Sequence, residues 1–351
     1  MEKIWWEHVP GALAFSNKIF GAISNEQNIV LASKNGLPWR DHLCNAIKER
    51  FRLSLESKRI EELYNISTPG EYLLKKYCKP EKRAEYRPSR SFANFFANSE
   101  DIVFHDRLFW VRLTENSSLN EWMTFISDYT KERGNDKKQA TFLVECIVDK
   151  SIGNKKGINV VSFDEYISDY DRFVFCLLAA SSVNESVNIK KYLSELISNV
   201  IGNNVEFCEK IVADYSSFLA NPFAYITRTM GAQLQTKESL STFSKTEATV
   251  IHDVWLSQVR IVYPILEDYR ERFVKKHWKD ISKNLPLSSS NGEIYRVPED
   301  VELGKLRYLA DNQKINTTAN ELTELILHTQ ARNDLSHLKI LDISNVRKIL
   351  K

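Results

Sequence analysis

The sequence predicts an α/β domain over residues 1–180, followed by an all-α region over residues 181–351. In the first part, short apolar runs of strand length alternate with segments of helical periodicity. This order is typical of a mainly parallel sheet covered by helices. In the second part the strand patterns disappear and helical periodicity continues. A chain of 351 residues is long enough to form two separate cores.

Four apolar runs in the first part are predicted strands. They cover Asn28–Ala32, Asp106–Leu113, Thr141–Val148 and Ile158–Phe163. Helical spacing predicts helices over Gly11–Ser24, Trp39–Arg52 and Trp122–Lys131. We expect the basic, proline-containing stretch Lys79–Arg90 to be a surface loop.

A strand, a turn and a helix follow one another over residues 28–52, the order in which P-loop NTPases carry their phosphate-binding loop. The turn Ser33–Pro38 contains only Gly36 and lacks the Gly-x-x-x-x-Gly-Lys-Ser/Thr pattern. Apolar runs ending in an acid at Glu145 and at Asp164 resemble the outline of a Walker B strand. We therefore expect a degenerate P-loop-like sheet domain that lacks a Walker A motif. Retained binding of ATP or GTP remains an alternative.

The second part is expected to contain six helices and one long loop. The helices cover Tyr192–Ile201, Glu206–Ala220, Glu247–Trp278, Val301–Leu309, Thr318–Leu335 and Ser344–Leu350. The loop covers Asn284–Val297, which is rich in serine and contains proline, asparagine and glycine.

The residues that point to chemistry lie near the carboxyl end, in the segment Arg332-Asn333-Asp334-Leu335-Ser336-His337. RNA cleavage without a metal needs a group that moves protons and fixed positive charge near the phosphate. His337 can take or give a proton near neutral pH. Arg332 is a permanent cation whose donors match phosphate oxygens, and Asn333 can orient the imidazole or a phosphate oxygen.

The spacing of these residues along a helix brings only some of them to one site. Asn333 and His337 are four residues apart and share a helix face. Arg332 and His337 are five apart, which places them about 140° apart around an ideal helix. They meet at one phosphate if the arginine wraps around the helix, if the helix is distorted, or if a second copy of the chain contributes.

The pattern Arg-Asn-x-x-x-His, followed by a leucine, a short break and a last helix, resembles the HEPN superfamily, which includes toxin and CRISPR-associated ribonucleases. The clear likeness covers about the last forty residues, and we expect the HEPN-like module over about residues 245–351. The resemblance implies a helical bundle that dimerises and cuts RNA without a metal or cofactor, with Arg332, Asn333 and His337 at the active site. His328, one turn before Arg332, is a candidate RNA contact.

Other features narrow the class of protein. The net charge of +2 provides no overall attraction to nucleic acid, so RNA binding requires a local patch. The five cysteines are scattered, which favours buried thiols over a metal or redox site. We find neither a signal peptide nor a membrane-spanning run and expect a cytoplasmic protein.

The resemblance implies a homodimeric endoribonuclease, a toxin or effector in bacterial antiphage defence. One alternative is a non-catalytic HEPN-like adaptor or dimerisation subunit that binds a partner protein from a defence operon. Another is a regulatory nucleotide-binding protein. RNA cleavage in EDTA and nucleotide titration distinguish these alternatives.

Overall fold

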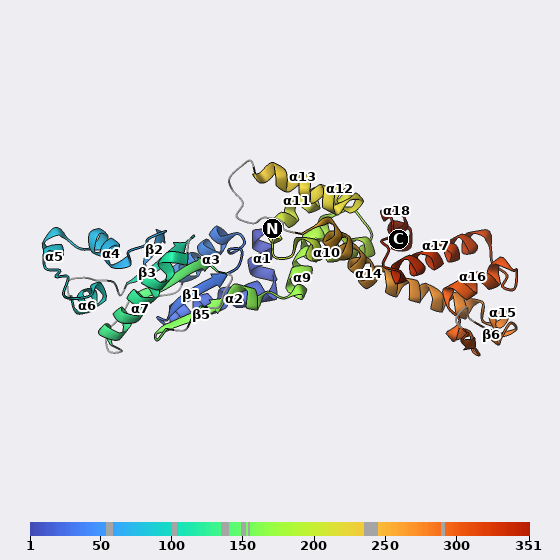
Figure 1. Cartoon of the computed structure of the whole chain (residues 1–351), viewed down its shortest axis with the longest axis horizontal. Coiled ribbons are helices and arrows are strands. Elements are labelled where there is room, and N and C mark those ends of the chain that lie inside the picture. The colour runs from blue at the N-terminus through green and yellow to red at the C-terminus, as the bar shows by residue number, and fades with distance from the viewer. Residues whose placement is uncertain are drawn as a thin grey trace. The chain divides into compact units, whose positions relative to one another are not determined.

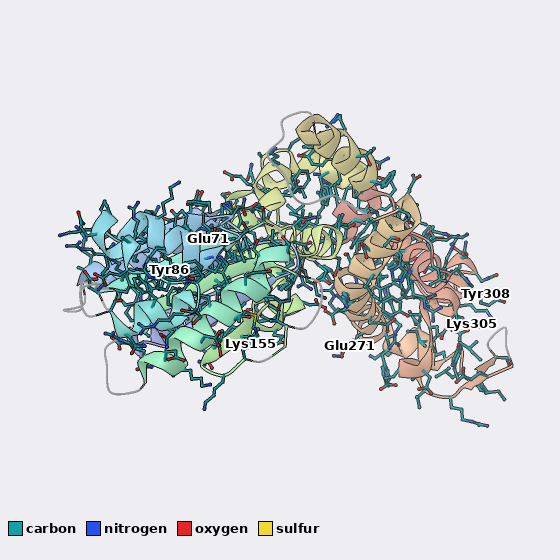
Figure 2. All side chains as sticks on the ribbon, turned by 60° about the vertical axis from the view of Figure 1, so that its left-hand side comes forward. Glu71, Tyr86, Lys155, Glu271, Lys305 and Tyr308 are labelled. Atoms are coloured by element: carbon teal, nitrogen blue, oxygen red, sulfur yellow. The ribbon has the colours of Figure 1, made fainter. Side chains whose placement is uncertain are left out.

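A computed structural model describes residues 1–53, 59–99, 104, 106–114, 116–134, 140–148, 152–153, 155–234, 245–288 and 292–351. The chain divides into two compact units, Met1–Phe175 and Cys176–Lys351 (Figure 1). Figure 2 adds the side chains, with Glu71, Tyr86 and Lys155 labelled on the first unit.

The N-terminal unit contains a five-stranded parallel sheet in the order β2-β3-β4-β1-β5 (Figure 1). Its strands are β1 (Asn28–Ser33), β2 (Arg59–Tyr64), β3 (Arg107–Leu113), β4 (Thr141–Ile147) and β5 (Ile158–Ser162). The interior strand β1 pairs with β4 and β5, and Val30 lies opposite Val144 and Val160. All six residues of β1 are buried, as expected for a strand covered on both faces.

The helices of this unit precede, connect or follow its strands. They are α1 (Glu2–His8), α2 (Pro10–Ser24), α3 (Arg40–Leu53), α4 (Pro69–Tyr77), α5 (Pro80–Ala84), α6 (Phe92–Asn98), α7 (Leu119–Arg133), α8 (Phe163–Tyr166) and α9 (Asp169–Ala179), which continues across the division between the units. The crossover from β1 to β2 runs across the sheet in the opposite direction to the crossover from β3 to β4. Because such crossovers are right-handed, α3 and α7 cover opposite faces of the sheet.

The core on the α7 face is largely aromatic. Trp122 and Phe125 of α7 pack with Phe109 of β3 and Phe142 of β4, and all four side chains are buried. Phe109 and Phe142 stack at a centroid distance of 5.2 Å. This packing holds α7 and the neighbouring α6 against the sheet.

In its described residues, the C-terminal unit contains helices and one two-stranded hairpin. Its elements are α10 (Val187–Ile201), α11 (Cys208–Ala213), α12 (Tyr215–Ala220), α13 (Pro222–Leu234), α14 (Glu247–Lys276), α15 (Trp278–Ser282), β6 (Leu287–Ser288), β7 (Ile294–Tyr295), α16 (Leu303–Asp311), α17 (Ala319–Ser336) and α18 (Ile343–Ile349). The long α14 packs against α10, α17 and α18 within this unit (Figure 1). A second core joins Phe273 of α14 to Leu306 of α16 and Leu325 of α17.

Three local expectations were wrong. The stretch Lys79–Arg90 contains the short helix α5, because Pro80 occupies a first helical position where no amide hydrogen is needed. The single helix expected over Glu206–Ala220 is interrupted at Asp214, whose φ of −129° and ψ of 47° leave the helical region. The expected loop at Asn284–Val297 contains the hairpin β6–β7.

Within the described part of the chain, no helix combines the length and the apolar character needed to cross a bilayer.

Candidate active site

The Arg-Asn-x-x-x-His motif lies where α17 ends. The helix stops at Ser336, and His337 has a φ of −102° and a ψ of 24°. Leu338 follows with a φ of +59°, and the Lys339 amide donates to the Asp334 carbonyl oxygen at 2.9 Å. A left-handed residue with this backward hydrogen bond is a common way to satisfy the last carbonyls of a helix. The histidine of the motif is therefore the C-cap residue rather than part of a regular helical turn.

The imidazole of His337 is exposed, whereas Asn333 is half-buried one turn earlier. The backbone amide of His337 donates to the Asn333 carbonyl oxygen at 3.1 Å, which keeps the two residues in adjacent turns. Among the described residues, no hydrogen bond or ion pair involves the His337 ring. Its ring is thus accessible to a molecule that binds at the end of α17.

Arg332, five residues before His337, forms an ion pair with a residue outside the motif. Its Nη2 lies 3.2 Å from Oε1 of Glu302, the residue that precedes α16. The Arg332 side chain is 29% exposed and that of Glu302 is 53% exposed. The guanidinium is therefore held by one solvated carboxylate, and a phosphate can compete for it.

Two residues of α14 fix the end of α17 and the turn that follows it. Trp255 donates its indole N–H to the Leu335 carbonyl oxygen at 2.9 Å. Gln258, 1% exposed, accepts from the Leu341 amide at 2.7 Å and donates to the Leu341 carbonyl oxygen at 3.0 Å. Sequence reasoning did not single out Gln258 or Glu302. The signal for Gln258 was a polar residue within the apolar stripe of a long helix.

His328 lies in a packed environment. It is 8% exposed and stacks on the Tyr269 ring at a centroid distance of 3.8 Å. Its Nδ1 donates to the Glu324 carbonyl oxygen at 2.8 Å, because a carbonyl oxygen can only accept. Burial lowers the pKa of His328 from its ordinary value of 6.5. These contacts favour a role in joining α17 to α14 over direct contact with RNA.

The turn after β1 in the N-terminal unit also differs from an open phosphate-binding loop. The Lys34 amide donates to Oδ2 of Asp164 at 2.9 Å, so a carboxylate of the chain occupies one position where a phosphate oxygen would bind. Gly36 has a φ of +83°, which glycine adopts without strain.

The acid near the end of β4 is buried in a polar network. Glu145 accepts from Arg40 Nε at 2.9 Å and from the Trp110 indole at 3.1 Å. Arg40 also contacts Glu62 of β2 at 3.1 Å. Because Glu145 already accepts hydrogen bonds from a buried cation and an indole, its carboxylate is engaged in contacts within the N-terminal unit.

A search of the described residues finds no group of three or more histidine, cysteine, aspartate or glutamate side chains that could hold a metal ion. All five cysteines are buried and none forms a disulfide. Burial is the main reason that the pKa of the Cys44 thiol rises to about 11 and that of the Cys146 thiol to about 12.

No protein-family model matches the chain, and a search of curated proteins finds no match. The resemblance to HEPN ribonucleases therefore depends on the residues of the motif and on the helical setting described above.

Proposed function

We propose that this protein is an endoribonuclease of the HEPN type that acts without a metal ion and works as a homodimer. The observation that carries the proposal is the exposed imidazole of His337 at the end of α17, in the same short segment as a guanidinium paired with a solvated carboxylate. A proton-transferring group and a phosphate-binding cation are the two groups that such chemistry requires.

The proposed reaction is a transfer of the phosphodiester to the neighbouring 2′-hydroxyl. The 2′-oxygen attacks phosphorus and loses its proton to a base, the bond to the 5′-oxygen breaks, and an acid protonates that oxygen. The products are a 2′,3′-cyclic phosphate and a 5′-hydroxyl. His337 performs one of the two proton transfers, and Arg332 stabilises the negative charge on the phosphorane oxygens.

A second copy of the chain explains how the two proton transfers are divided. A single His337 cannot be base and acid in the same concerted step, whereas a two-fold axis supplies an equivalent imidazole and guanidinium. Leu338 is 70% exposed and Ile340 is 44% exposed directly after the motif. Apolar side chains exposed beside a polar site are typical of surfaces that bind another molecule, so we propose that the dimer forms here.

The test uses the full chain and a labelled RNA in the presence of EDTA. We expect cleavage that leaves 2′,3′-cyclic phosphate ends, together with a loss of at least about a hundredfold in His337→Ala and in Arg332→Ala. His8→Ala removes another exposed histidine, and Arg307→Ala removes another half-buried arginine paired with one carboxylate. Both controls should retain wild-type activity.

The principal alternative is a non-catalytic dimerisation subunit or adaptor. A purified dimer that leaves every RNA intact would support it, and so would cleavage that survives both Ala substitutions, because a contaminating nuclease would then explain the activity. Loss of activity in the two variants with unchanged thermal melting supports the enzyme.

A role as a toxin or effector of antiphage defence is part of the same proposal and follows from the HEPN resemblance. It predicts that expression arrests growth of a bacterial host and that His337→Ala relieves the arrest. Equal toxicity of the two proteins would contradict this role.

A further inference from the structure

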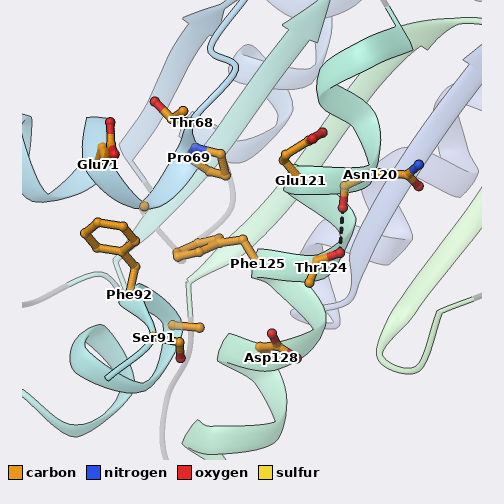
Figure 3. Close-up of a pocket in the computed structure, with 12 residues that line it drawn as sticks. Thr68, Pro69, Glu71, Ser91, Phe92, Asn120, Glu121, Thr124, Phe125 and Asp128 are labelled. Atoms are coloured by element: carbon orange, nitrogen blue, oxygen red, sulfur yellow. Dashed lines mark hydrogen bonds between the residues drawn. The ribbon is translucent and has the colours of Figure 1, made fainter. Parts of the chain in front are cut away.

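A cavity of about 420 Å³ opens on the N-terminal unit between α4, α6 and α7 (Figure 3). This volume falls in the range of sites for small molecules. Phe125 of α7 and Pro69 at the start of α4 are buried in its wall, and the half-buried Phe92 of α6 supplies a second ring. Phe92 is itself held in place by stacking on Tyr86 at 4.4 Å. The part of the wall formed by Phe125, Pro69 and Phe92 is therefore apolar, and Phe92 is held by packing within the chain.

Three carboxylates lie around these rings. Glu121 and Asp128 come from α7 and Glu71 comes from α4, and Figure 3 shows Phe125 drawn between Glu121 and Asp128. All three carboxylates are exposed, and none has an ion-pair partner among the residues that the structure describes. The charge of this cavity is complementary to a cation.

The spacing of the two carboxylates along α7 determines how far apart the positive charges of a matching cation lie. Glu121 and Asp128 are seven residues apart, which corresponds to two helical turns and a rise of about 10 Å. Phe125 lies between them on the same face. A ligand that places an apolar stem on the Phe125 ring and an ammonium group near each carboxylate satisfies all three side chains. Ammonium groups are also attracted to the faces of aromatic rings.

An ammonium group of the chain already reaches this rim. Lys155 Nζ donates to the Thr124 hydroxyl, which belongs to the same face of α7. Lys155 provides one positive charge against three carboxylates, so the excess of negative charge remains. The Lys155 ammonium group also competes with a bound cation for this cavity.

We propose that this cavity binds a linear aliphatic diamine or polyamine. The apolar stem lies over Phe125 and Phe92, and the terminal ammonium groups pair with Glu121, Asp128 and Glu71. The site lies in the N-terminal unit and does not depend on the ribonuclease proposal.

Isothermal titration calorimetry of the full chain tests this proposal with four probes. We expect 1,8-diaminooctane and spermidine to bind one equivalent with a sub-millimolar dissociation constant that weakens as salt is added. We expect no binding of 1,8-octanediol, which keeps the stem without charge, or of Mg²⁺ at this site, which has charge without a stem. Binding of the diol as strongly as the diamine, or displacement of the diamine by equimolar Mg²⁺, would overturn the proposal.

Variants assign the heat of binding to this cavity. Glu121→Gln and Asp128→Asn should each weaken diamine binding about two- to fivefold, as expected for ion pairs in contact with solvent. Glu81→Gln neutralises an exposed acid of α5 outside the cavity and should have no effect. Lys155→Met should strengthen binding because it removes the competing ammonium group.

Two further results count against the site. Unchanged diamine affinity in the Glu121→Gln/Asp128→Asn double variant would show that the diamine binds elsewhere. Binding of a lysine-rich peptide without any binding of free diamine would show a protein-docking surface instead.

Discussion

Arg332 Nη2 lies 3.2 Å from Glu302 Oε1, so the phosphate-binding cation of the proposed active site is held by the N-cap residue of α16. The carboxylate lies outside the motif, 30 residues earlier in the chain. Under the proposed function, an RNA phosphate competes with Glu302 for the same guanidinium.

Replacing Glu302 by Gln should therefore increase kcat/KM for RNA cleavage. An exposed ion pair contributes about 0.2–1 kcal/mol, which corresponds to a gain of up to about fivefold. Asp311→Asn is the matched control, because it releases Arg307 on the same helix without affecting the motif. Initial rates on a labelled RNA measure the effect. A fall in Glu302→Gln to the level of Arg332→Ala would show that Glu302 positions the arginine for catalysis.

Gln258→Leu should destabilise the C-terminal unit by about 2 kcal/mol. The substitution removes both hydrogen-bond partners of the Leu341 backbone, and a buried polar group left unpaired costs about 1–3 kcal/mol. Urea unfolding and the hydrogen-exchange rate of the Leu341 amide measure the loss. Gln330→Leu on the exposed side of α17 is the control, with an expected change within about 0.5 kcal/mol. Equal stability of the two variants would contradict the role assigned to Gln258.

His328 should make the protein less stable in acid. Burial lowers its pKa in the folded state below the 6.5 of the unfolded chain, so the unfolded state binds more protons between the two values. The contribution is present in full above pH 6.5 and is lost as the pH falls through that window.

His328→Phe keeps a ring that can stack on Tyr269 and removes this titration. The melting temperature of the wild type should therefore fall more than that of His328→Phe between pH 7.5 and pH 5. Identical pH dependence of the two melting temperatures would rule out His328 as the cause.

The five cysteines should not react with Ellman's reagent in the folded protein. All are buried, and burial raises the pKa of Cys44 to about 11 and that of Cys146 to about 12, so little thiolate is present at neutral pH. In guanidinium chloride, five thiols per chain should react. Rapid reaction of one thiol without denaturant would mean that its side chain reaches solvent.

Gly70→Ala should destabilise the N-terminal unit although alanine is the better helix former. A Cβ atom at this position would lie 2.4 Å from the Phe92 ring, and such overpacking costs about 1–3 kcal/mol. Gly21→Ala in α2 is the opposite case, because a Cβ there meets nothing within 4 Å. It should stabilise the protein by about 0.5–1 kcal/mol. Thermal melting distinguishes the two, and a stabilising effect of Gly70→Ala would contradict the close contact.

Four of the five strands were predictable because each is a nearly continuous apolar run. The missed strand, β2, has the sequence Arg59-Ile60-Glu61-Glu62-Leu63-Tyr64 and lies at the edge of the sheet. Its charged residues interrupt the apolar run by which the other four strands were predicted. Lys48 and Arg40 of α3 pair with Glu62, and these hydrogen bonds outweigh burial and lower its pKa to about 2. The strand can be identified only when its tertiary contacts with α3 are known.

For α17, too, some features were predictable from the sequence and others were not. Its start was predictable from Thr318 and Glu321, which form a capping box. Its end was expected near Leu335, and the helix extends to Ser336. Nothing local indicated that His328 packs on Tyr269 while His337 remains exposed, because Tyr269 belongs to α14, far from His328 in the sequence.

The sequence by itself determined the alternation of strands and helices, the helix that carries the motif, and the order of Arg332, Asn333 and His337 along it. These features follow from periodicity and from capping residues, which act over a few neighbouring positions. Only the tertiary structure decided that His328 is buried, that Glu302 holds Arg332, and that Glu71 meets the carboxylates of α7 around one cavity. Each of these depends on contacts between segments far apart in the chain, whose pairing is set by the packing of the cores.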